Sequence, residues 1–366
     1  MRVLFYTGDK QWSGSTRATL TAARGLASRE HQITIACCGD SELDVKARAA
    51  GIDTIAINAE SSTAGGAWDL RKVLKERFIE AAIVGTERDH LIVASAMRFA
   101  ERGGVLRRVP SFAGVDVQRV SRIALRMAAA GVIVTTERER RELRADAFPI
   151  PATVAPLGVD PAAYDDIEPL SREELGAPRR GLLVVCSYGP SGRQRISTVF
   201  RTLALLAPRH NNLHVVVIGP GSTEDDVRMH ASALGVSPAV TFLGEIDDPI
   251  RAFRAADAGW VVSNGDSAAF AALDFMALRV PVIAERSPLT QHYVADGITG
   301  LLLAPGDPSF TASNVAEFLM TTDNRIAMGN AGRTRVQRDF SLGAMIDGFE
   351  KAVNAAGDRT RWTGTR

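Results

Sequence analysis

The chain has 366 residues, of which 46% are hydrophobic and 23% are charged, and its formal net charge is +1. A length of this order favours two domains, and the composition is typical of globular proteins rather than disordered or fibrous chains. The balanced charge gives no global attraction to nucleic acid or to an acidic membrane.

The cysteines are Cys37, Cys38 and Cys186, all in or beside apolar stretches. Their odd number and their spacing argue against a disulfide framework or a metal site, so we expect buried reduced thiols in a cytoplasmic protein. The apolar stretch that opens the chain is shorter than a signal peptide requires. No stretch approaches the ~20 apolar residues of a membrane span.

The first half of the chain alternates short apolar stretches with longer amphipathic ones. The expected strands cover 3–7, 33–38, 54–57, 81–84, 109–112, 131–135 and 153–155. The expected helices cover 15–29, 43–50, 68–78, 91–101, 117–130 and 137–147. Strands that alternate with helices of this kind predict an α/β fold, with a parallel sheet covered by helices on both faces.

Residues 156–180 interrupt the alternation with repeated prolines and little periodicity, which indicates a linker. A second series follows, with expected strands over 182–186, 214–218, 240–243, 259–262, 280–284 and 300–303. We therefore expect two doubly wound, Rossmann-like domains, over 1–165 and 166–340. A C-terminal helix over 341–356 is expected to pack back on the first domain, and a disordered tail is expected over 357–366.

One stretch of the second half, Ala258 to Ala284, reads as strand, polar loop, helix and strand. Asp274 falls on a largely apolar face of the helix, where a carboxylate costs free energy unless a donor binds it. Asp266 lies at or just before the first turn, where a carboxylate can cap free N–H groups. The loop follows a strand, where open α/β sheets bind ligands. The pattern alone leaves two readings open: acids satisfied within the protein, or a pair of ligand-binding acids.

The second half contains a characteristic series of short segments in order. They are LHVVVIGPG, VTFLG, AAD before GWVV, the acids Asp266 and Asp274 eight residues apart, and DGITG before the last strand. In this order they resemble the retaining glycosyltransferases of the GT-B fold, family 4, also called glycosyltransferases group 1. The first half is similar to the family through PLGVD at 156–160 and through its opening glycine loop.

The resemblance implies a bacterial-type enzyme that moves a sugar from a nucleotide diphosphate sugar to an unidentified acceptor. It implies retention of configuration, no metal and no cofactor. The donor, a UDP- or GDP-sugar, would bind the C-terminal domain, and the acceptor would bind the N-terminal domain across a cleft. No nucleic-acid partner is expected.

The resemblance also assigns roles by position. Asp266 matches the catalytic acid that faces the donor sugar, and Asp274 matches the acid that accepts hydrogen bonds from ribose hydroxyls. The remaining expected donor contacts are Arg193, Arg195, Gly219, Phe242, Leu243, Gly244, Ser267, Ala268 and Ala269. Gly14 and Ser15 form the expected loop at the diphosphate and acceptor.

The chain departs from the family at several chemical positions. Both acids are aspartate where the family has glutamate, so each carboxylate is one methylene shorter. The family's phosphate-binding arginine and lysine fall on Gly189 and Gln194, so phosphate contact rests on Arg193 or Arg195, which can equally be solvated charges.

The family's histidine in the N-terminal domain falls near Ala113, with His90 as a weak stand-in. Because fixed cations stabilise the leaving diphosphate, an alternative reading stays open. It is a catalytically weak or inactive pseudoenzyme that acts as partner or regulator of another glycosyltransferase.

Arginines at positions 119, 122 and 126 recur at helical spacing beside apolar residues. This pattern occurs in helices that lie on a membrane surface, and also on ordinary solvated helix faces. Peripheral contact of the N-terminal domain with the inner face of the membrane is therefore kept beside a cytoplasmic location.

Overall fold

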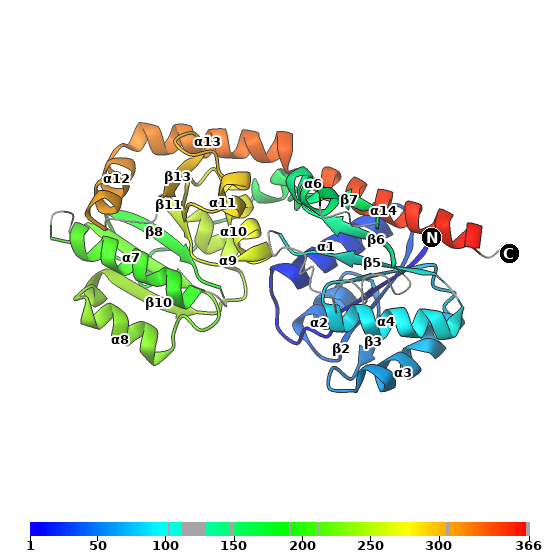
Figure 1. The fold of residues 1–366 in the computed structure, drawn as a ribbon. Coiled ribbons are helices and arrows are strands. Elements are labelled where there is room, and N and C mark those ends of the chain that lie inside the picture. Colours follow the sequence, from blue (N-terminus) through cyan, green and yellow to red (C-terminus); the bar gives the residue numbers. More distant parts are fainter. Residues whose placement is uncertain are drawn as a thin grey trace. The chain divides into compact units, whose positions relative to one another are not determined.

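The computed structural model describes residues 1–101, 103–111, 129–145, 150–189, 192–208, 210, 212–304 and 308–363. The chain divides into two compact units (Figure 1). Unit 1 comprises Met1–Leu157 together with Gly343–Arg366, and unit 2 comprises Gly158–Leu342. Each unit has its own parallel sheet and its own hydrophobic core.

Unit 1 is built on a seven-stranded sheet with the strand order β3-β2-β1-β4-β5-β6-β7. Its strands are β1 (Arg2–Tyr6), β2 (Gln32–Cys38), β3 (Asp53–Ile57), β4 (Ala81–Val84), β5 (Gly104–Arg108), β6 (Ala129–Val134) and β7 (Ala152–Val154). Its helices are α1 (Gly14–Ala27), α2 (Glu42–Ala49), α3 (Thr63–Glu76), α4 (Glu87–Ala100), α6 (Glu137–Ala145) and α14 (Leu342–Thr363). Apolar side chains of β1, β4, α3 and α4 share one core.

The last helix, α14, belongs to unit 1 although it is encoded at the other end of the chain. Arg29, just after α1, forms ion pairs with Asp347 and Glu350, each at 2.5 Å. Close packing adds to these charges, because a Cβ at Gly25 would lie 2.3 Å from the Ile346 side chain. The helix continues to Thr363, so the stretch 357–363, expected as a tail, is helical here.

Unit 2 is built on a six-stranded sheet with the strand order β10-β9-β8-β11-β12-β13. Its strands are β8 (Leu182–Ser187), β9 (Leu213–Ile218), β10 (Val240–Gly244), β11 (Ala258–Val261), β12 (Val282–Glu285) and β13 (Gly300–Leu303). Its α-helices are α7 (Gly192–Leu206), α8 (Asp225–Ala233), α9 (Pro249–Arg254), α10 (Gly265–Ala277), α11 (Pro288–Tyr293), α12 (Pro308–Met320) and α13 (Thr322–Asp339). Two 3₁₀ turns, η1 (Pro161–Tyr164) and η2 (Ser237–Ala239), complete it.

The two sheets share one topology, and the predicted fold class is confirmed. In each unit the third, second, first, fourth, fifth and sixth strands follow one another across the sheet, all in parallel. This is the doubly wound order, and the direction of winding reverses between the first and fourth strands. The reversal falls between β1 and β4 in unit 1 and between β8 and β11 in unit 2. Ligands of such sheets bind at the carboxyl ends of these strands.

The prediction of a strand over 109–112 is wrong. The strand is β5, at Gly104–Arg108; the preceding helix ends at Ala100 with Glu101 as a left-handed cap, and Gly103, with a φ of +68°, leads into the strand. Arg107 and Arg108 interrupted the apolar pattern that would have identified it. The expected helix over 117–130 lies mostly outside the described residues, and its last two positions belong to β6.

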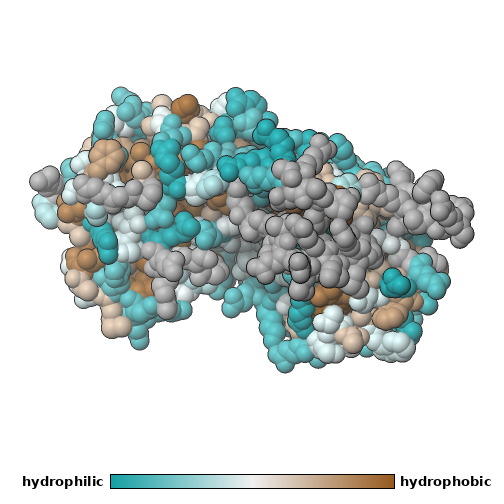
Figure 2. Space-filling view, viewed as in Figure 1, coloured by the Kyte–Doolittle hydropathy of each residue, from teal (hydrophilic) through white to brown (hydrophobic). Residues whose placement is uncertain are grey.

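Among the described residues, no helix is both long enough and apolar enough to cross a membrane. On the face drawn in Figure 2, hydrophobic residues are scattered among hydrophilic ones rather than gathered in one band. Single exposed apolar side chains of this kind are normal on a protein surface. The predicted membrane-contacting helix around Arg119 and Arg126 lies outside the described residues.

Gly219, after β9, is the tightest backbone position at the carboxyl edge of unit 2. Its φ is +136°, and a Cβ there would lie 1.8 Å from the carbonyl oxygen of Tyr188. We expect Gly219→Ala to lower the free energy of unfolding by at least about 3 kcal/mol, because left-handed strain adds to a backbone clash. Chemical denaturation followed by circular dichroism measures this change.

Gly235→Ala is the matched control. Gly235 also has a positive φ, of +69°, but a Cβ there meets no described atom within 4 Å. Gly235→Ala should lower the free energy of unfolding by about 1–2 kcal/mol, because it adds only the strain of a left-handed backbone. Equal losses in the two variants would contradict the importance of the contact with Tyr188.

Candidate functional site

The carboxyl edge of the unit 2 sheet brings four loops together, largely through glycine. The Gly219 N–H donates to the carbonyl of Gly244, at 2.7 Å, so the ends of β9 and β10 touch. A Cβ at Gly189 would lie 2.5 Å from Cβ of Ser263, so the loops after β8 and β11 are equally close. Glycine therefore lets the loops at this edge approach one another closely, and it would equally allow the close approach of a ligand.

Helix α10 starts at this edge and positions both predicted acids. It begins at Gly265, whose φ is +54°, and Asp266 lies in its first turn, where the helix dipole favours negative charge. The helix packs tightly: a Cβ at Gly259 of β11 would lie 2.4 Å from the Phe275 ring. Asp266 is 3% exposed and Asp274 is 1% exposed.

Asp274 has a donor within unit 2. The hydroxyl of Tyr164, at the end of η1, donates to Asp274 Oδ1 at 2.6 Å, and both side chains are buried. The next residue, Asp165, pairs with Arg333 of α13 at 2.7 Å. Arg333 also donates to the carbonyl of Ala277, at 2.9 Å. A contact between Asp274 and ribose hydroxyls stays a prediction, but its carboxylate already accepts a hydrogen bond from the phenol of Tyr164.

Arg195, one of the two arginines expected at the diphosphate, has an acidic neighbour. Its Nη1 lies 3.4 Å from Oε2 of Glu285, the last residue of β12. The hydroxyl of Thr198, one helical turn further along α7, donates to Oε1 of the same carboxylate at 2.6 Å. A phosphate that binds Arg195 would therefore have to share it with Glu285. The side chain of Arg193 lies outside the described residues.

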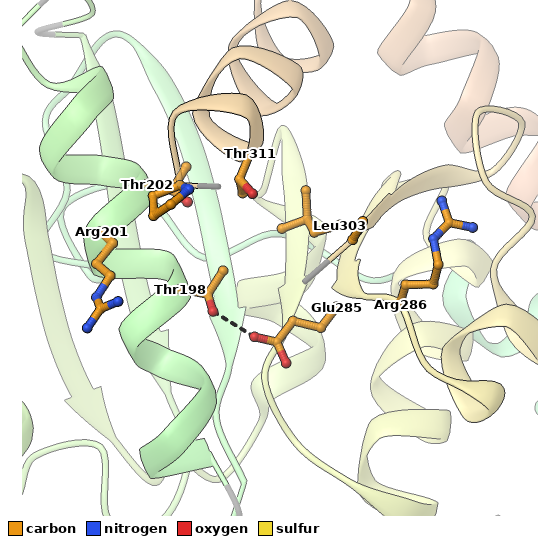
Figure 3. A pocket seen from close by; sticks show the side chains of 9 residues that line it. Thr198, Arg201, Thr202, Glu285, Arg286, Leu303 and Thr311 are labelled. Atoms are coloured by element: carbon orange, nitrogen blue, oxygen red, sulfur yellow. Dashed lines mark hydrogen bonds between the residues drawn. The ribbon is translucent and has the colours of Figure 1, made fainter. Parts of the chain in front are cut away.

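Beside this pair the surface opens into a cavity of about 260 Å³. It is lined by Thr198, Arg201, Thr202, Glu285, Arg286, Leu303, Ala304, Pro308 and Thr311. Figure 3 shows Thr198 and Glu285 turned toward each other, while the guanidinium groups of Arg201 and Arg286 point away from them. Arg286 is engaged with Asp296. The cavity thus presents one carboxylate and threonine hydroxyls, and Arg201 adds a positive charge to its lining.

The other predicted donor contacts lie along the same edge. The ring of Phe242 packs edge-on against Phe200, with centroids 6.0 Å apart, and the Arg228 guanidinium lies over it at 5.3 Å. Its side chain is therefore used in packing, which leaves the backbone of Phe242, Leu243 and Gly244 for a ligand. Ala268 and Ala269 are buried, and Ser267 is partly exposed.

In unit 1, Gly14 and Ser15 form the first turn of α1, beside the loop that follows β1. Ser13 caps this helix: its N–H donates to Thr16 Oγ1 at 2.7 Å, and its hydroxyl accepts from the Thr16 N–H at 3.4 Å. The predicted stand-in histidine, His90, lies inside α4 and is fully buried. It is not a loop histidine that faces a substrate, because α4 begins four residues earlier than the apolar pattern indicated.

Asp89 is a buried carboxyl at the β1/β4 reversal that the sequence interpretation missed. It is 2% exposed, and its N–H donates to the hydroxyl of Thr86, which caps α4. Burial raises the pKa of Asp89, the hydrogen bond from Thr86 opposes this, and the charge of Asp9 raises the pKa further. Burial and the Asp89 charge also raise the pKa of Tyr6 to about 12. The spacing of Thr86 and Asp89, typical of a helix start, was the available signal.

We expect Asp89→Asn to change how stability depends on pH. The folded-state pKa of Asp89 lies above the unfolded value of about 3.9. The stability that the neutral carboxyl contributes to the folded state is therefore lost as pH rises through the folded-state pKa. Asparagine does not ionise, so the melting temperature of the variant relative to wild type should rise from about pH 4 to about pH 8. Asp69→Asn, at an exposed position of α3, is the control. If the difference in melting temperature between Asp89→Asn and wild type did not vary with pH, the raised pKa of Asp89 would be contradicted.

Known proteins resemble both the sequence and the fold. Residues 170–335 match the family model described as Glycosyl transferases group 1. A D-inositol 3-phosphate glycosyltransferase of Corynebacterium jeikeium is 30% identical over 239 residues, which are 60% of this chain and 56% of that protein. This chain therefore spans little more than half the length of that relative.

A GDP-mannose-dependent alpha-(1-6)-phosphatidylinositol monomannoside mannosyltransferase of Mycobacterium tuberculosis is 29% identical over 361 residues, 91% of this chain and 93% of that protein. The crystal structure of Anabaena HepE in complex with UDP and glucose superposes with a TM-score of 0.81 at 16% identity, covering 97% of this chain and 100% of that one. The last likeness concerns the fold, which is the GT-B fold. Residues 170–335 therefore belong to the glycosyl transferases group 1 family.

Proposed function

We propose that this chain is a glycosyltransferase that moves a hexosyl group from a nucleotide diphosphate sugar to a hydroxyl of an inositol-containing acceptor. The observation that carries the proposal is Asp266, in the first turn of α10 at the β8/β11 reversal, within the segment that matches the family. The activities for which the relatives from Corynebacterium and Mycobacterium are named support the donor and acceptor classes.

In this proposal the donor lies along the carboxyl edge of unit 2. The backbone of Phe242 to Gly244 faces the base, and Gly219 and the turn 267–269 allow close approach. The diphosphate lies near the starts of α7 and α10, where helix N-termini favour anions. Arg195, with Arg193, supplies the positive charge, and Asp266 accepts hydrogen bonds from the sugar. Gly14 and Ser15 of unit 1 serve the acceptor side.

The proposed reaction retains configuration and uses no metal. An acceptor hydroxyl oxygen bonds to the anomeric carbon while the bond from that carbon to the diphosphate oxygen breaks. The nucleoside diphosphate leaves with the electron pair, and the hydroxyl proton passes to one of its phosphate oxygens. Since negative charge grows on the leaving group, a fixed arginine stabilises the transition state more than the ground state.

A pseudoenzyme is the second candidate, and two contacts favour it. Arg195 is paired with Glu285, and Asp274 is bonded to Tyr164, so both groups expected at the donor have partners inside unit 2. In that case the chain would bind nucleotide weakly or not at all and would act on another glycosyltransferase.

The direct test is a panel of nucleoside diphosphates (UDP, GDP, ADP and dTDP) and their hexoses. We expect one base to raise the melting temperature, since a ligand at 100 times its dissociation constant adds about 2.7 kcal/mol of stability. The matching nucleotide sugar should then glycosylate D-inositol 3-phosphate or phosphatidylinositol monomannoside. Nuclear magnetic resonance of the product reports the anomeric configuration, and added chelator tests metal independence. A flat thermal response together with no transfer would overturn the enzyme proposal in favour of the pseudoenzyme.

Arg195→Ala should weaken binding of the nucleoside diphosphate by at least about tenfold, because a charge-assisted contact is lost. Binding of the corresponding nucleoside, which has no phosphate, should not change. Arg201→Ala is the matched control, since Arg201 is an exposed arginine six residues further along α7 whose guanidinium points away from Glu285. Equal affinity of the Arg195 variant and wild type, measured by calorimetry, would remove Arg195 from the diphosphate site.

A further inference from the structure

The buried hydrogen bond between Tyr164 and Asp274 occupies the acid that the family resemblance assigns to ribose. The phenol oxygen lies 2.6 Å from Asp274 Oδ1, and the exposed fractions of the two residues are 7% and 1%. A hydroxyl that donates to a carboxylate at this distance makes one of the stronger hydrogen bonds of a protein. Tyr164 thus supplies within the protein what a ribose hydroxyl would supply from a ligand.

Tyr164 is held where it is by several contacts. Asp160 caps η1, accepting from the Ala162 N–H at 3.0 Å. Asp165 pairs with Arg333 of α13, and Val159 bonds on both sides to the segment 340–342, at 3.1 and 2.9 Å. The chain is therefore held before and after Tyr164, and the tyrosine itself is 7% exposed, so its phenol is placed inside unit 2 beside Asp274.

Asp274 is equally fixed. The neighbouring Phe275 stacks on Phe253, with centroids 4.1 Å apart, and lies against Gly259 of β11. Met276 lies against Gly332 of α13, where a Cβ would be 3.0 Å from its side chain. These contacts pack the helix closely on both sides, and an aspartate carries its carboxylate one methylene closer to the helix axis than a glutamate would. The carboxylate therefore stays below the surface, consistent with its 1% exposure.

We infer that Tyr164 and Asp274 form an internal pair that withdraws Asp274 from the recognition of ribose hydroxyls at the donor site. The donors of this chain then include nucleotides that lack a ribose hydroxyl, such as 2′-deoxynucleoside diphosphates and their sugars. This inference rests on the proposed function and deepens it, because it widens the class of donor that the carboxyl edge of unit 2 accepts.

The test compares matched ligands on the full-length protein. The nucleoside diphosphate that stabilises wild type is titrated by calorimetry beside its 2′-deoxy and 3′-deoxy analogues. If Asp274 accepted a hydrogen bond from a ribose hydroxyl, the analogue that lacks this hydroxyl would bind at least about tenfold more weakly than the parent. We expect the deoxy analogues to bind within about threefold of the parent, below that threshold.

Variants separate the internal pair from a ligand contact. Tyr164→Phe and Asp274→Asn should each lower the melting temperature. The double variant should lower it by less than the sum of the two single effects, because Phe removes and Asn weakens the same shared hydrogen bond. The ratio of deoxy to parent affinity should stay the same in Asp274→Asn. Tyr6→Phe, at a buried tyrosine of unit 1, is the control, and its effect should add to that of Asp274→Asn.

The outcomes distinguish this inference from the function on which it rests. No binding of any nucleoside diphosphate by wild type would overturn the proposed function and the inference together. Binding with a preference of tenfold or more for the parent ribonucleotide would overturn the inference alone. Additive losses in the Tyr164 and Asp274 variants would show that the two side chains are not coupled, and would overturn it as well.

Discussion

The packing of α10 is the constraint on which the candidate site of unit 2 depends. Gly259 leaves space in β11 for the Phe275 ring, which lies 2.4 Å from the position that a Cβ would take. Gly332 likewise lets α13 approach Met276. These contacts fix the axis of the helix that carries Asp266 and Asp274. When a helix is packed this closely, the length of an acidic side chain limits what its carboxylate can reach.

The charged groups near this edge are largely satisfied by one another. Arg195 contacts Glu285, Arg286 contacts Asp296, and Asp274 accepts a hydrogen bond from Tyr164. Paired groups of this kind stabilise a partly buried surface, but they bind an incoming anion only by exchanging one partner for another. The free energy of donor binding at such an edge is therefore a difference between two sets of similar contacts.

The fold was predictable from sequence because its recognisable segments contain the residues that hold strands and loops of unit 2 together. The acid of the AAD segment, Asp257, accepts from the Leu183 N–H at 2.8 Å and so joins β8 to the start of β11. The acid of DGITG, Asp296, accepts from the Leu302 N–H at the same distance. Gly158 of PLGVD has no space for a Cβ, which would lie 2.3 Å from the carbonyl oxygen of Ser341.

The site was less predictable because its decisive contacts join distant positions. Tyr164 and Asp274 are 110 residues apart, and Arg195 and Glu285 are 90 residues apart. A motif records which acid stands on α10, but not which side chain the fold brings against it. Asp89 was missed for a related reason: its perturbed pKa comes from burial, which composition and spacing do not report.

Unit 1 is assembled from both ends of the chain, and this has a consequence for its biosynthesis. Phe349 of α14 is fully buried and lies beside Phe5 of the first strand, with ring centroids 6.5 Å apart. A Cβ at Gly357 would lie 2.5 Å from the side chain of Met1. Chains fold as they leave the ribosome, N-terminal parts first. The sheet of unit 1 is made before unit 2 and α14 after it, so this sheet must wait, with its α14 face uncovered, until all of unit 2 has been made.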